Sequence, residues 1–375
     1  MIYLDSAATT LQKPSAVARA MAEAVGAMTS PGRGNYGPSS RASRTLLALR
    51  EKAAELFGMS RPEQVILTHN ATHGLNLAVK TMVRPGARVL LSGWEHNAVT
   101  RPLATIPGVR ARTVEAPLFQ PKQFLEDLDR KLKEGTDGVI CTHVSNVFGY
   151  ILPVGEIAAR CWAASVPLLV DASQSAGVLP ISMDEWGADF VAMPGHKGLL
   201  GPMGTGLLLL GDQMLPRPLR EGGTGSASES LRQPTMLPDR LESGTANLPG
   251  IAGLVQGLKF VLSHRAAIAE YEYVLSEQLR RGLEQIPGVT LYAGPAGLPH
   301  VGVVSFNLRG MDSGEAADRL NRAGIAVRGG LHCAPSIHAW LGTTGAVRAS
   351  VGPFNTERDV DALVDAARKI QKGQL

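Results

Sequence analysis

Short apolar runs alternate with helical patterns over about residues 45 to 250, and this alternation limits the fold more than any other feature of the chain. Short apolar runs that are spaced by helices are typical of strands buried on both faces of a mostly parallel sheet. The predicted strands span residues 64–68, 88–92, 138–142, 167–170, 190–193 and 206–210. We therefore predict an α/β fold in which helices, such as one over 39–57, sandwich the sheet.

The pattern becomes a mix of helices and strands after about residue 260. The predicted elements are a helix over 271–286, a strand over 301–306, a helix near 315–320, a strand over 325–327 and a last helix from Thr356, where Asp359 completes a capping box. A chain of 375 residues is long enough for a large and a small domain. We expect the large domain over 15–255 and a smaller α+β domain from 1–14 and 256–375. Within the large domain, the Gly-, Ser- and Pro-rich stretch 217–250 is expected to be a long ordered excursion and not a linker.

The composition excludes several classes of protein. With 44% hydrophobic and 19% charged residues, the chain is expected to be globular. Its longest apolar runs, such as 206–210, fall far short of the ~20 residues that span a bilayer. The first residues show no secretory signal, so we expect a cytoplasmic protein without membrane contact. The net charge of +4 is spread along the chain and forms no basic block, so we do not expect nucleic-acid binding. Attraction of anionic small molecules explains the charge equally well.

The cysteines and histidines predict neither a disulfide framework nor a metal site. There are three cysteines, an odd number, with no CxxC pair, and the nine histidines show no HExxH spacing. Cys141 and Cys161 are expected to be buried small hydrophobes. Cys333 differs, because it lies in a loop with two glycines beside His332. We expect its thiol to be exposed, where a nearby cation favours the thiolate.

Polar clusters follow five of the predicted strands. They occupy residues 70–73, 95–97, 145–146, 171–174 and 196–197. In an open α/β sheet, ligands bind beyond the carboxyl ends of the strands. We therefore expect these clusters to meet around one ligand.

Lys197 and Asp171 are the most informative members of these clusters, since each follows a buried strand. A lysine amine forms a Schiff base with the aldehyde of pyridoxal phosphate, and an aspartate holds the pyridine nitrogen protonated. The plainer alternatives are a solvated lysine in a Gly-rich loop and a helix-capping aspartate.

Four further positions have a functional and a structural interpretation. The turn at 70–74, with the Thr72 hydroxyl, is either an anion site at a helix N-terminus or an ordinary N-cap. His96 either lies against an aromatic cofactor and exchanges protons or is a structural histidine. Asn146 binds a carboxylate or makes a turn. Arg348 holds a substrate carboxylate bidentately or forms a surface ion pair.

Taken together, the motifs resemble a known family. The chain is similar to the fold-type I, class V aminotransferase-like pyridoxal-phosphate enzymes, and more narrowly to the cysteine desulfurase and selenocysteine lyase group. The loop around Cys333 resembles the branch that includes the SUF-type desulfurases. The matching motifs cover essentially the whole chain in order: 3–10, 95–98, 145–149, 170–174, 195–197, 242–245, 328–334, 348–350 and 355–356.

This resemblance implies a role for each matching residue. On the catalytic side, Lys197 would hold the cofactor and shuttle the α-proton, and Cys333 would accept sulfur from L-cysteine. His96 would stack on the ring and exchange protons near the leaving sulfur. The remaining cofactor contacts implied are Asp171 to the pyridine nitrogen, Gln174 to the phenolic oxygen, and Thr72, the His73 backbone and His196 to the phosphate. Thr245 would reach the phosphate of a neighbouring subunit, which implies a homodimer. The substrate contacts implied are Asn146, Arg348, Arg328 and Asn35.

The chain departs from the family pattern at two places, one at the phosphate and one that leaves the preferred substrate open. Pro194 stands where the family often has a hydroxyl residue, so one phosphate hydrogen bond, about 1–3 kcal/mol, would be missing. Asn35 lies in a segment where related enzymes commonly carry a histidine. L-selenocysteine therefore remains an alternative substrate. Amino transfer or β-elimination remain alternative reactions, and a non-catalytic sensor or scaffold is less favoured. The sequence does not identify the acceptor of the sulfur.

Overall fold

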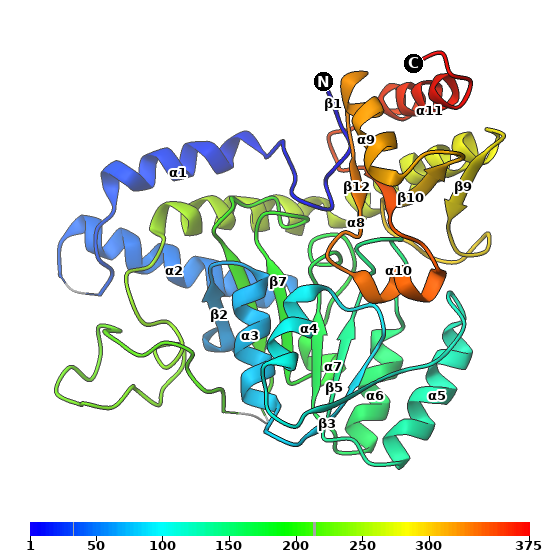
Figure 1. The fold of residues 1–375 in the computed structure, drawn as a ribbon. Coiled ribbons are helices and arrows are strands. Elements are labelled where there is room, and N and C mark those ends of the chain that lie inside the picture. The colour runs from blue at the N-terminus through cyan, green and yellow to red at the C-terminus, as the bar shows by residue number, and fades with distance from the viewer. Residues whose placement is uncertain (33, 213–214) are drawn as a thin grey trace.

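A seven-stranded mixed sheet forms the centre of the larger part of the molecule (Figure 1). The structure is a computed structural model that describes residues 1–32, 34–212 and 215–375. Across the sheet the strands are β2 (Val65–Thr68), β8 (Gly206–Leu210), β7 (Phe190–Pro194), β6 (Leu168–Asp171), β5 (Gly138–Thr142), β3 (Arg88–Leu91) and β4 (Arg110–Thr113). All pairs are parallel except those of β8, which runs antiparallel to both β2 and β7. The predicted α/β class with a mostly parallel sheet is confirmed.

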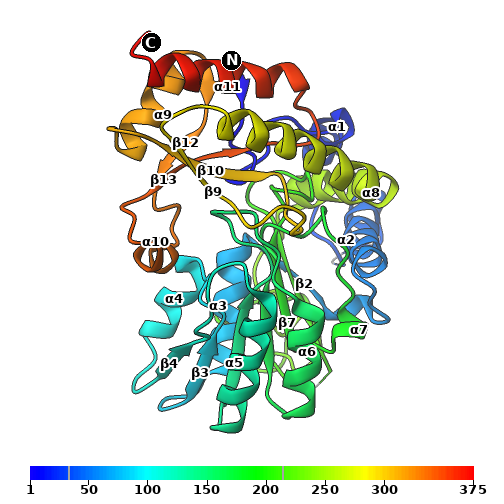
Figure 2. The ribbon, with the colours of Figure 1, turned by 90° about the vertical axis from the view of Figure 1, so that its right-hand side faces the viewer.

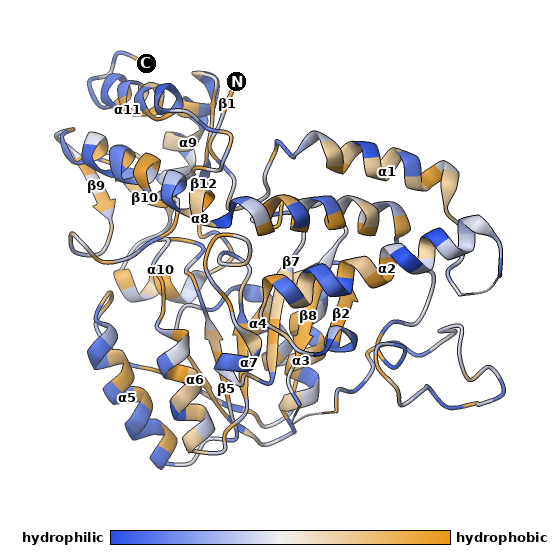
Figure 3. Ribbon diagram, turned by 180° about the vertical axis from the view of Figure 1, so that it is seen from behind, coloured by the Kyte–Doolittle hydropathy of each residue, from blue (hydrophilic) through white to orange (hydrophobic). Residues whose placement is uncertain are grey.

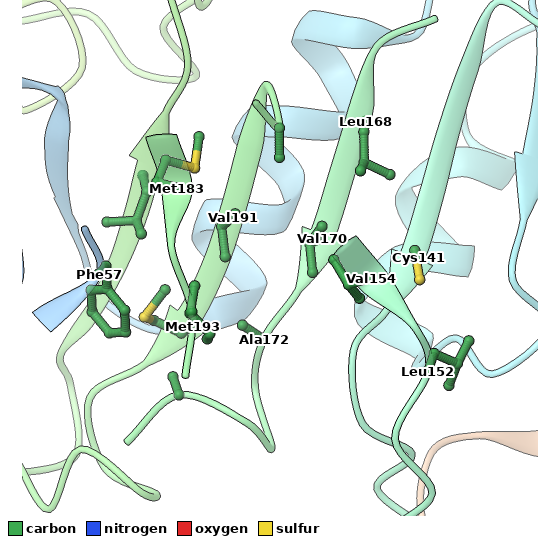
Figure 4. Close-up of a cluster of buried hydrophobic side chains, with 14 of the residues drawn as sticks. Phe57, Cys141, Leu152, Val154, Leu168, Val170, Ala172, Met183, Val191 and Met193 are labelled. Carbon is green, nitrogen blue, oxygen red and sulfur yellow. The ribbon is translucent and has the colours of Figure 1, made fainter. Parts of the chain in front are cut away.

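Successive residues of each central strand face two separate hydrophobic cores, as expected for a sheet buried on both faces. In β6, Leu169 packs into the core under one set of helices and Val170 into the core under the other. Figure 4 shows the second of these cores, with Val170, Val191 and Met193 from the sheet facing Phe57. The central strands are therefore hydrophobic along their length, as β8 is in Figure 3.

The helices that cover this sheet lie on both of its faces. One face carries α3 (Ala71–Met82) and α4 (Asn97–Ala104). The other carries α2 (Gly37–Leu56), α5 (Pro121–Lys133), α6 (Val154–Ala163), the short α7 (Met183–Trp186) and the start of α8 (Leu248–Glu284). Helix α1 (Ser15–Ala27) packs on α8 (Figure 1).

A second, four-stranded antiparallel sheet forms the smaller part. Its order is β12 (Arg328–Gly330), β13 (Ala346–Ser350), β10 (Val303–Leu308) and β9 (Val289–Tyr292). It is covered by α9 (Ser313–Arg322), α11 (Glu357–Gln371) and the end of α8, with their own hydrophobic core. The predicted capping box of Thr356 and Asp359 is present at α11. Helix α10 (Pro335–Leu341) follows the loop that carries Cys333.

Helix α8 is a single helix of 37 residues that runs from the large sheet to the small one (Figure 2). The sequence predicted only its second half, because its first half is rich in glycine and lacks an amphipathic pattern. The glycines permit close packing: a Cβ at Gly257 would lie 2.3 Å from the carbonyl oxygen of Leu199. The predicted domain boundary at residue 255 falls inside this helix and stays a prediction.

The N-terminal arm, residues 1–14, joins the two parts. Strand β1 (Ile2–Tyr3) pairs in parallel with β11 (Ile325–Ala326), and Leu4 is buried in the core of the small sheet. The arm then crosses to the large sheet, where Thr10 contacts the segment after β7. Within the described parts of the chain, none of the helices is both long and apolar enough to span a bilayer.

Candidate active site

A cavity of about 210 Å³ opens at the carboxyl ends of β5, β6 and β7, beside the turn between β2 and α3. Of the positions predicted from the sequence, seven line it: Thr72, His96, Asn146, Asp171, Gln174, His196 and Lys197. The polar clusters at the strand ends therefore meet in one place, as parallel strands dictate.

Lys197 follows β7 through the segment Gly195–His196 and is half-buried in the cavity wall. Desolvation by burial, followed by the charge of Arg348, lowers the pKa of its amine to about 8. Because only the neutral amine is a nucleophile, this shift raises the fraction of Lys197 that can form a Schiff base near neutral pH.

Asp171 is the last residue of β6 and is buried at the cavity. Its Oδ1 atom accepts a hydrogen bond from the N–H of Ser173 at 2.9 Å. No described residue donates to Oδ2. One oxygen of a buried carboxylate is thus oriented by the backbone while the other remains available to a ligand N–H.

His96 caps the N-terminus of α4, and its Nδ1 atom accepts from the N–H of Ala98 at 3.0 Å. Burial lowers the pKa of the ring, against the opposing effect of Asp171. A neutral His96 that accepts at Nδ1 carries its proton on Nε2, so the ring presents an N–H donor on its other side.

Glu95 fixes the turn before His96, a role that the sequence analysis did not recognise. Its buried carboxylate accepts from the N–H groups of Ser92 and Gly93, each at 2.8 Å, and from the Ser92 hydroxyl. Burial raises the pKa of Glu95 to about 7. Glu95 binds residues only two and three positions before it. The sequence offers no signal for such a local contact beyond the place of Glu95 after a strand.

The turn between β2 and α3 is capped by Asn70, whose side chain accepts from the N–H of His73 at 2.9 Å. The N-cap interpretation of this turn is thus correct, and the backbone N–H of His73, expected to bind phosphate, is already engaged. The N–H groups of Ala71 and Thr72 donate to no group in the described part of the chain. Both residues line the cavity, so an anion can still bind at this helix N-terminus.

The N-terminal arm holds the segment that carries Lys197. The carbonyl oxygen of His196 accepts from Thr10 N at 3.2 Å and from Lys13 Nζ at 2.8 Å, and its Nδ1 atom lies 3.0 Å from Thr9 Oγ1. Burial lowers the pKa of Lys13 to about 8. The motif 3–10 marked this arm, but neither Thr9, Thr10 nor Lys13 was predicted to support the lysine.

Arg348 is buried, with 3% of its side chain exposed, so its ion pair is not the surface pair that was the alternative. Its Nη1 atom donates to the carbonyl oxygen of Asn146 at 2.9 Å, and its Nη2 atom to Asp5 Oδ1 at 2.9 Å. Arg328, which is half exposed, binds Asp5 Oδ2 at 3.0 Å. Neither arginine is among the residues that line the cavity. Asp5, their shared partner, was missed because it lies more than 300 residues away in the sequence.

The thiol of Cys333 is exposed, as predicted, while Cys141 and Cys161 are buried. His332 and Cys333 both have positive φ values, 50° and 57°, which side chains other than glycine rarely adopt. The loop is held by its backbone: Asn146 Nδ2 donates to the His332 oxygen at 2.7 Å, and Asn97 N to the Cys333 oxygen at 2.8 Å.

His332 does not supply a cation to this thiol. Burial lowers the pKa of its ring to about 3, and its Nε2 atom donates to the carbonyl oxygen of Ala346 at 2.9 Å. The side chain is therefore neutral and structural, and anchors the loop to β13.

Thr245 and Asn35 lie apart from the cavity of their own chain. Thr245 lines a separate depression with His69 and Arg220, on the other side of the turn between β2 and α3. Asn35 is exposed just before α2. In the residues that the structure describes, neither contacts the predicted site.

The described residues contain no group of three or more acidic, histidine or cysteine side chains that could hold a metal ion.

Comparisons with known proteins agree with this geometry. The aminotransferase class-V family matches residues 2–363. A cysteine desulfurase of Escherichia coli (strain K12 / DH10B) is 33% identical over 387 aligned positions, which cover 99% of this chain and 94% of that protein. The apo structure of cysteine desulfurase from Thermococcus onnurineus NA1 superimposes with a TM-score of 0.92 at 31% identity, covering 99% of this chain and 95% of that one.

A second solved structure, cysteine desulfurase CsdA from Escherichia coli in an S-sulfonic acid form, gives a TM-score of 0.86 at 26% identity. It covers 100% of this chain and 95% of that one. The chain therefore belongs to the class-V aminotransferase family, whose members are pyridoxal-phosphate-dependent enzymes of fold type I.

Proposed function

We propose that this protein is a pyridoxal-phosphate-dependent cysteine desulfurase, which converts L-cysteine to L-alanine and takes the sulfur as a persulfide on Cys333. One observation carries the proposal: His96 lines the same cavity as Lys197 and Asp171, and the helix that it caps is joined to the Cys333 loop by the hydrogen bond from Asn97 N to the Cys333 oxygen. The thiol of Cys333 on this backbone-anchored loop is exposed. The names of the relatives, which are cysteine desulfurases, support the same reaction.

The residues of the cavity suit this cofactor. Asp171 Oδ2 is available to the pyridine N–H, Gln174 lies in the same wall, and Lys197 has a lowered pKa. Thr72 and the free N–H groups of Ala71 and Thr72 suit the phosphate, with His196 nearby. Pro194 adds no hydroxyl there. When bound as a Schiff base, the cofactor supplies an electron sink for the substrate's α-carbon.

The side chains divide the remaining work. Arg348, with Asn146, holds the α-carboxylate of L-cysteine, and the amine of Lys197 moves the α-proton. The thiolate of Cys333 attacks the substrate sulfur, so that an S–S bond forms while the carbon–sulfur bond breaks. The bonding electron pair stays with the β-carbon, which takes up a proton, and alanine leaves. The Nε2–H of His96 is a suitable donor for a proton near that carbon.

The test is Cys333→Ala on the cofactor-loaded protein. We expect alanine formation from L-cysteine to fall about 100-fold or more, because the sulfur loses its acceptor. Wild-type protein treated with L-cysteine alone should carry the persulfide on the Cys333 peptide by mass spectrometry. Cys161→Ala, which removes a buried thiol, is the matched control. Undiminished alanine formation in Cys333→Ala would contradict the proposal.

The same variant separates the alternatives. With L-selenocysteine, whose carbon–selenium bond is weaker, Cys333→Ala should retain part of the activity of the wild type. Amino transfer would instead appear as exchange with a supplied keto acid, and β-elimination as pyruvate in place of alanine.

The proposal includes a cytoplasmic homodimer. Thr245 does not line the cavity of its own chain, so a phosphate contact from it requires a second subunit. Asn35 does not line that cavity either, so we propose that it too acts at the cavity of the second subunit. Sedimentation of the protein should give the mass of a dimer. Thr245→Val should then weaken cofactor binding, because it removes the hydroxyl that contacts the phosphate. A monomer that retains full activity would contradict this arrangement.

A further inference from the structure

Two arginines lie directly opposite each other in the small sheet. Arg328 of β12 and Arg348 of β13 are paired residues in the antiparallel register. Like charges in this position repel and destabilise a sheet. The carboxylate of Asp5 lies between them, with Oδ1 on Arg348 at 2.9 Å and Oδ2 on Arg328 at 3.0 Å.

This triad has one positive charge in excess, because two guanidinium groups share one carboxylate. Asp5 is placed by its backbone, through a bridge to Ser350 and the burial of Leu4 before it. The Nε atom of Arg348 is buried and has no hydrogen-bond partner in the described part of the chain. Of its three guanidinium nitrogens, Nη1 donates to Asn146 and Nη2 to Asp5, so Nε is the one left without a partner.

The excess charge lies close to the active site, although neither arginine lines the cavity itself. Arg348 binds the main-chain oxygen of Asn146, which lines the cavity. Arg328 begins the strand that leads into the Cys333 loop, so it lies at the base of the loop that would receive the substrate's side chain. One arginine is thus associated with the α-carboxylate end of an amino acid and the other with its side-chain end.

We propose that Asp5 is a specificity-determining residue, which neutralises Arg328, orients Arg348, and so selects amino acids with one carboxylate over dicarboxylic amino acids. The inference rests on the proposed function and adds a rule for its substrate class. Without Asp5, two uncompensated guanidinium groups would lie beside the cavity, and the charge of the second would attract a carboxylate on the substrate's side chain. With Asp5 present, Arg328 is already paired. The side-chain carboxylate of a dicarboxylic amino acid would then lose water without gaining an ion pair, which costs binding free energy.

The experiment compares two probes, L-alanine and L-aspartate, on the cofactor-loaded protein. Each is titrated while the absorbance of the bound cofactor is followed, which gives a dissociation constant without turnover. For Asp5→Asn, we expect the affinity for L-aspartate relative to L-alanine to rise about tenfold or more. Asp365→Asn removes the same charge from an exposed pair with Arg368 and should leave the ratio unchanged.

Two more variants separate charge from structure. Arg328→Gln lowers the net charge of the triad and should shift the ratio against L-aspartate, and this arm remains informative if Asp5→Asn does not fold. The double variant Asp5→Asn/Arg328→Gln restores the original charge, so its ratio should return to within about twofold of the wild type. A purely structural Asp5 would change thermal stability and leave the ratio constant in all three variants.

The outcomes are unambiguous. A ratio that follows the net charge of the triad supports the inference. A ratio that is unchanged in Asp5→Asn, or that stays shifted in the double variant, overturns it. If L-cysteine is desulfurated normally while the ratio is constant, only this inference fails. If neither probe alters the spectrum of the wild type and L-cysteine is not consumed, the proposed function itself fails.

Discussion

The groups proposed to bind the cofactor and the groups proposed to bind the substrate, here called the cofactor side and the substrate side, are built in different ways. Asp171 and Lys197 lie at or just after the ends of adjacent strands of one sheet, so the order of that sheet brings them together. Arg348, Asp5 and Cys333 come from the small sheet, the N-terminal arm and a loop with positive φ values. The first group depends on one buried scaffold, whereas the second depends on contacts between separate segments.

This difference predicts different consequences of mutation. Changes on the cofactor side should abolish chemistry while the fold persists, because the sheet is held by hydrophobic packing on both faces. Apart from the loss of the acceptor thiol at Cys333, changes on the substrate side should alter the affinity for the amino acid, because they disturb the groups that we propose to hold it. The predictions below test that division.

Asp171→Asn should have the largest effect. The amide can keep the hydrogen bond to the N–H of Ser173 but cannot hold the pyridine nitrogen protonated. We expect kcat for L-cysteine to fall about 1,000-fold, with the cofactor still bound by its absorbance. A kcat within tenfold of the wild type would contradict the role given to Asp171.

Arg348→Gln should act chiefly on KM. The variant loses the charge that we propose to hold the α-carboxylate, so we expect KM for L-cysteine to rise about 100-fold with a smaller change in kcat. The exposed Arg368→Gln is the control for loss of a positive charge. An unchanged KM combined with a lower kcat would mean that Arg348 acts on the chemistry and not on substrate affinity. That result would contradict the separation between the cofactor side and the substrate side.

Glu272→Gln should have the smallest effect, on stability alone. Glu272 is buried in α8 beside Gly302, and burial raises the pKa of its carboxyl to about 8. A raised pKa in the folded state favours folding at low pH, and this contribution is lost as pH rises through about 8. The variant should therefore match the wild type near pH 4.5 and exceed it by about 1–3 kcal/mol at pH 9 in urea unfolding. Equal stability at both pH values would contradict a buried, unpaired carboxylate.

The sequence predicted the cofactor side more completely than the substrate side, for a physical reason. Strand β6 is a short run of buried apolar residues that ends in Asp171. This local pattern predicts both the strand and the position of the carboxylate at its end. Strand β4 was missed because its Arg-Ala-Arg-Thr sequence suits an exposed sheet edge. The first half of α8 was missed because glycines for close packing replace the usual periodicity.

Long-range partners were beyond local patterns. Asp5 meets Arg348, and Lys13 meets His196, only after the N-terminal arm has crossed between the two sheets. The N–H of His73, whose contact with phosphate stays a prediction, donates to the side chain of Asn70, and this partner too was not predicted. The resemblance to a family marked residues 3–10, which include Asp5, but it marked neither Lys13 nor the contacts that these residues make.

The central claim is that the amine of Lys197, and no other, binds the cofactor. The sharpest rival is Lys13, whose amine also has a pKa lowered to about 8 and lies against the same segment. The measurement is borohydride reduction of the cofactor-loaded protein, followed by peptide mass spectrometry of the wild type, Lys197→Ala and Lys13→Ala. The account predicts a label on the Lys197 peptide in the wild type and in Lys13→Ala, and none in Lys197→Ala. A label on Lys13, or one that persists in Lys197→Ala, would contradict it.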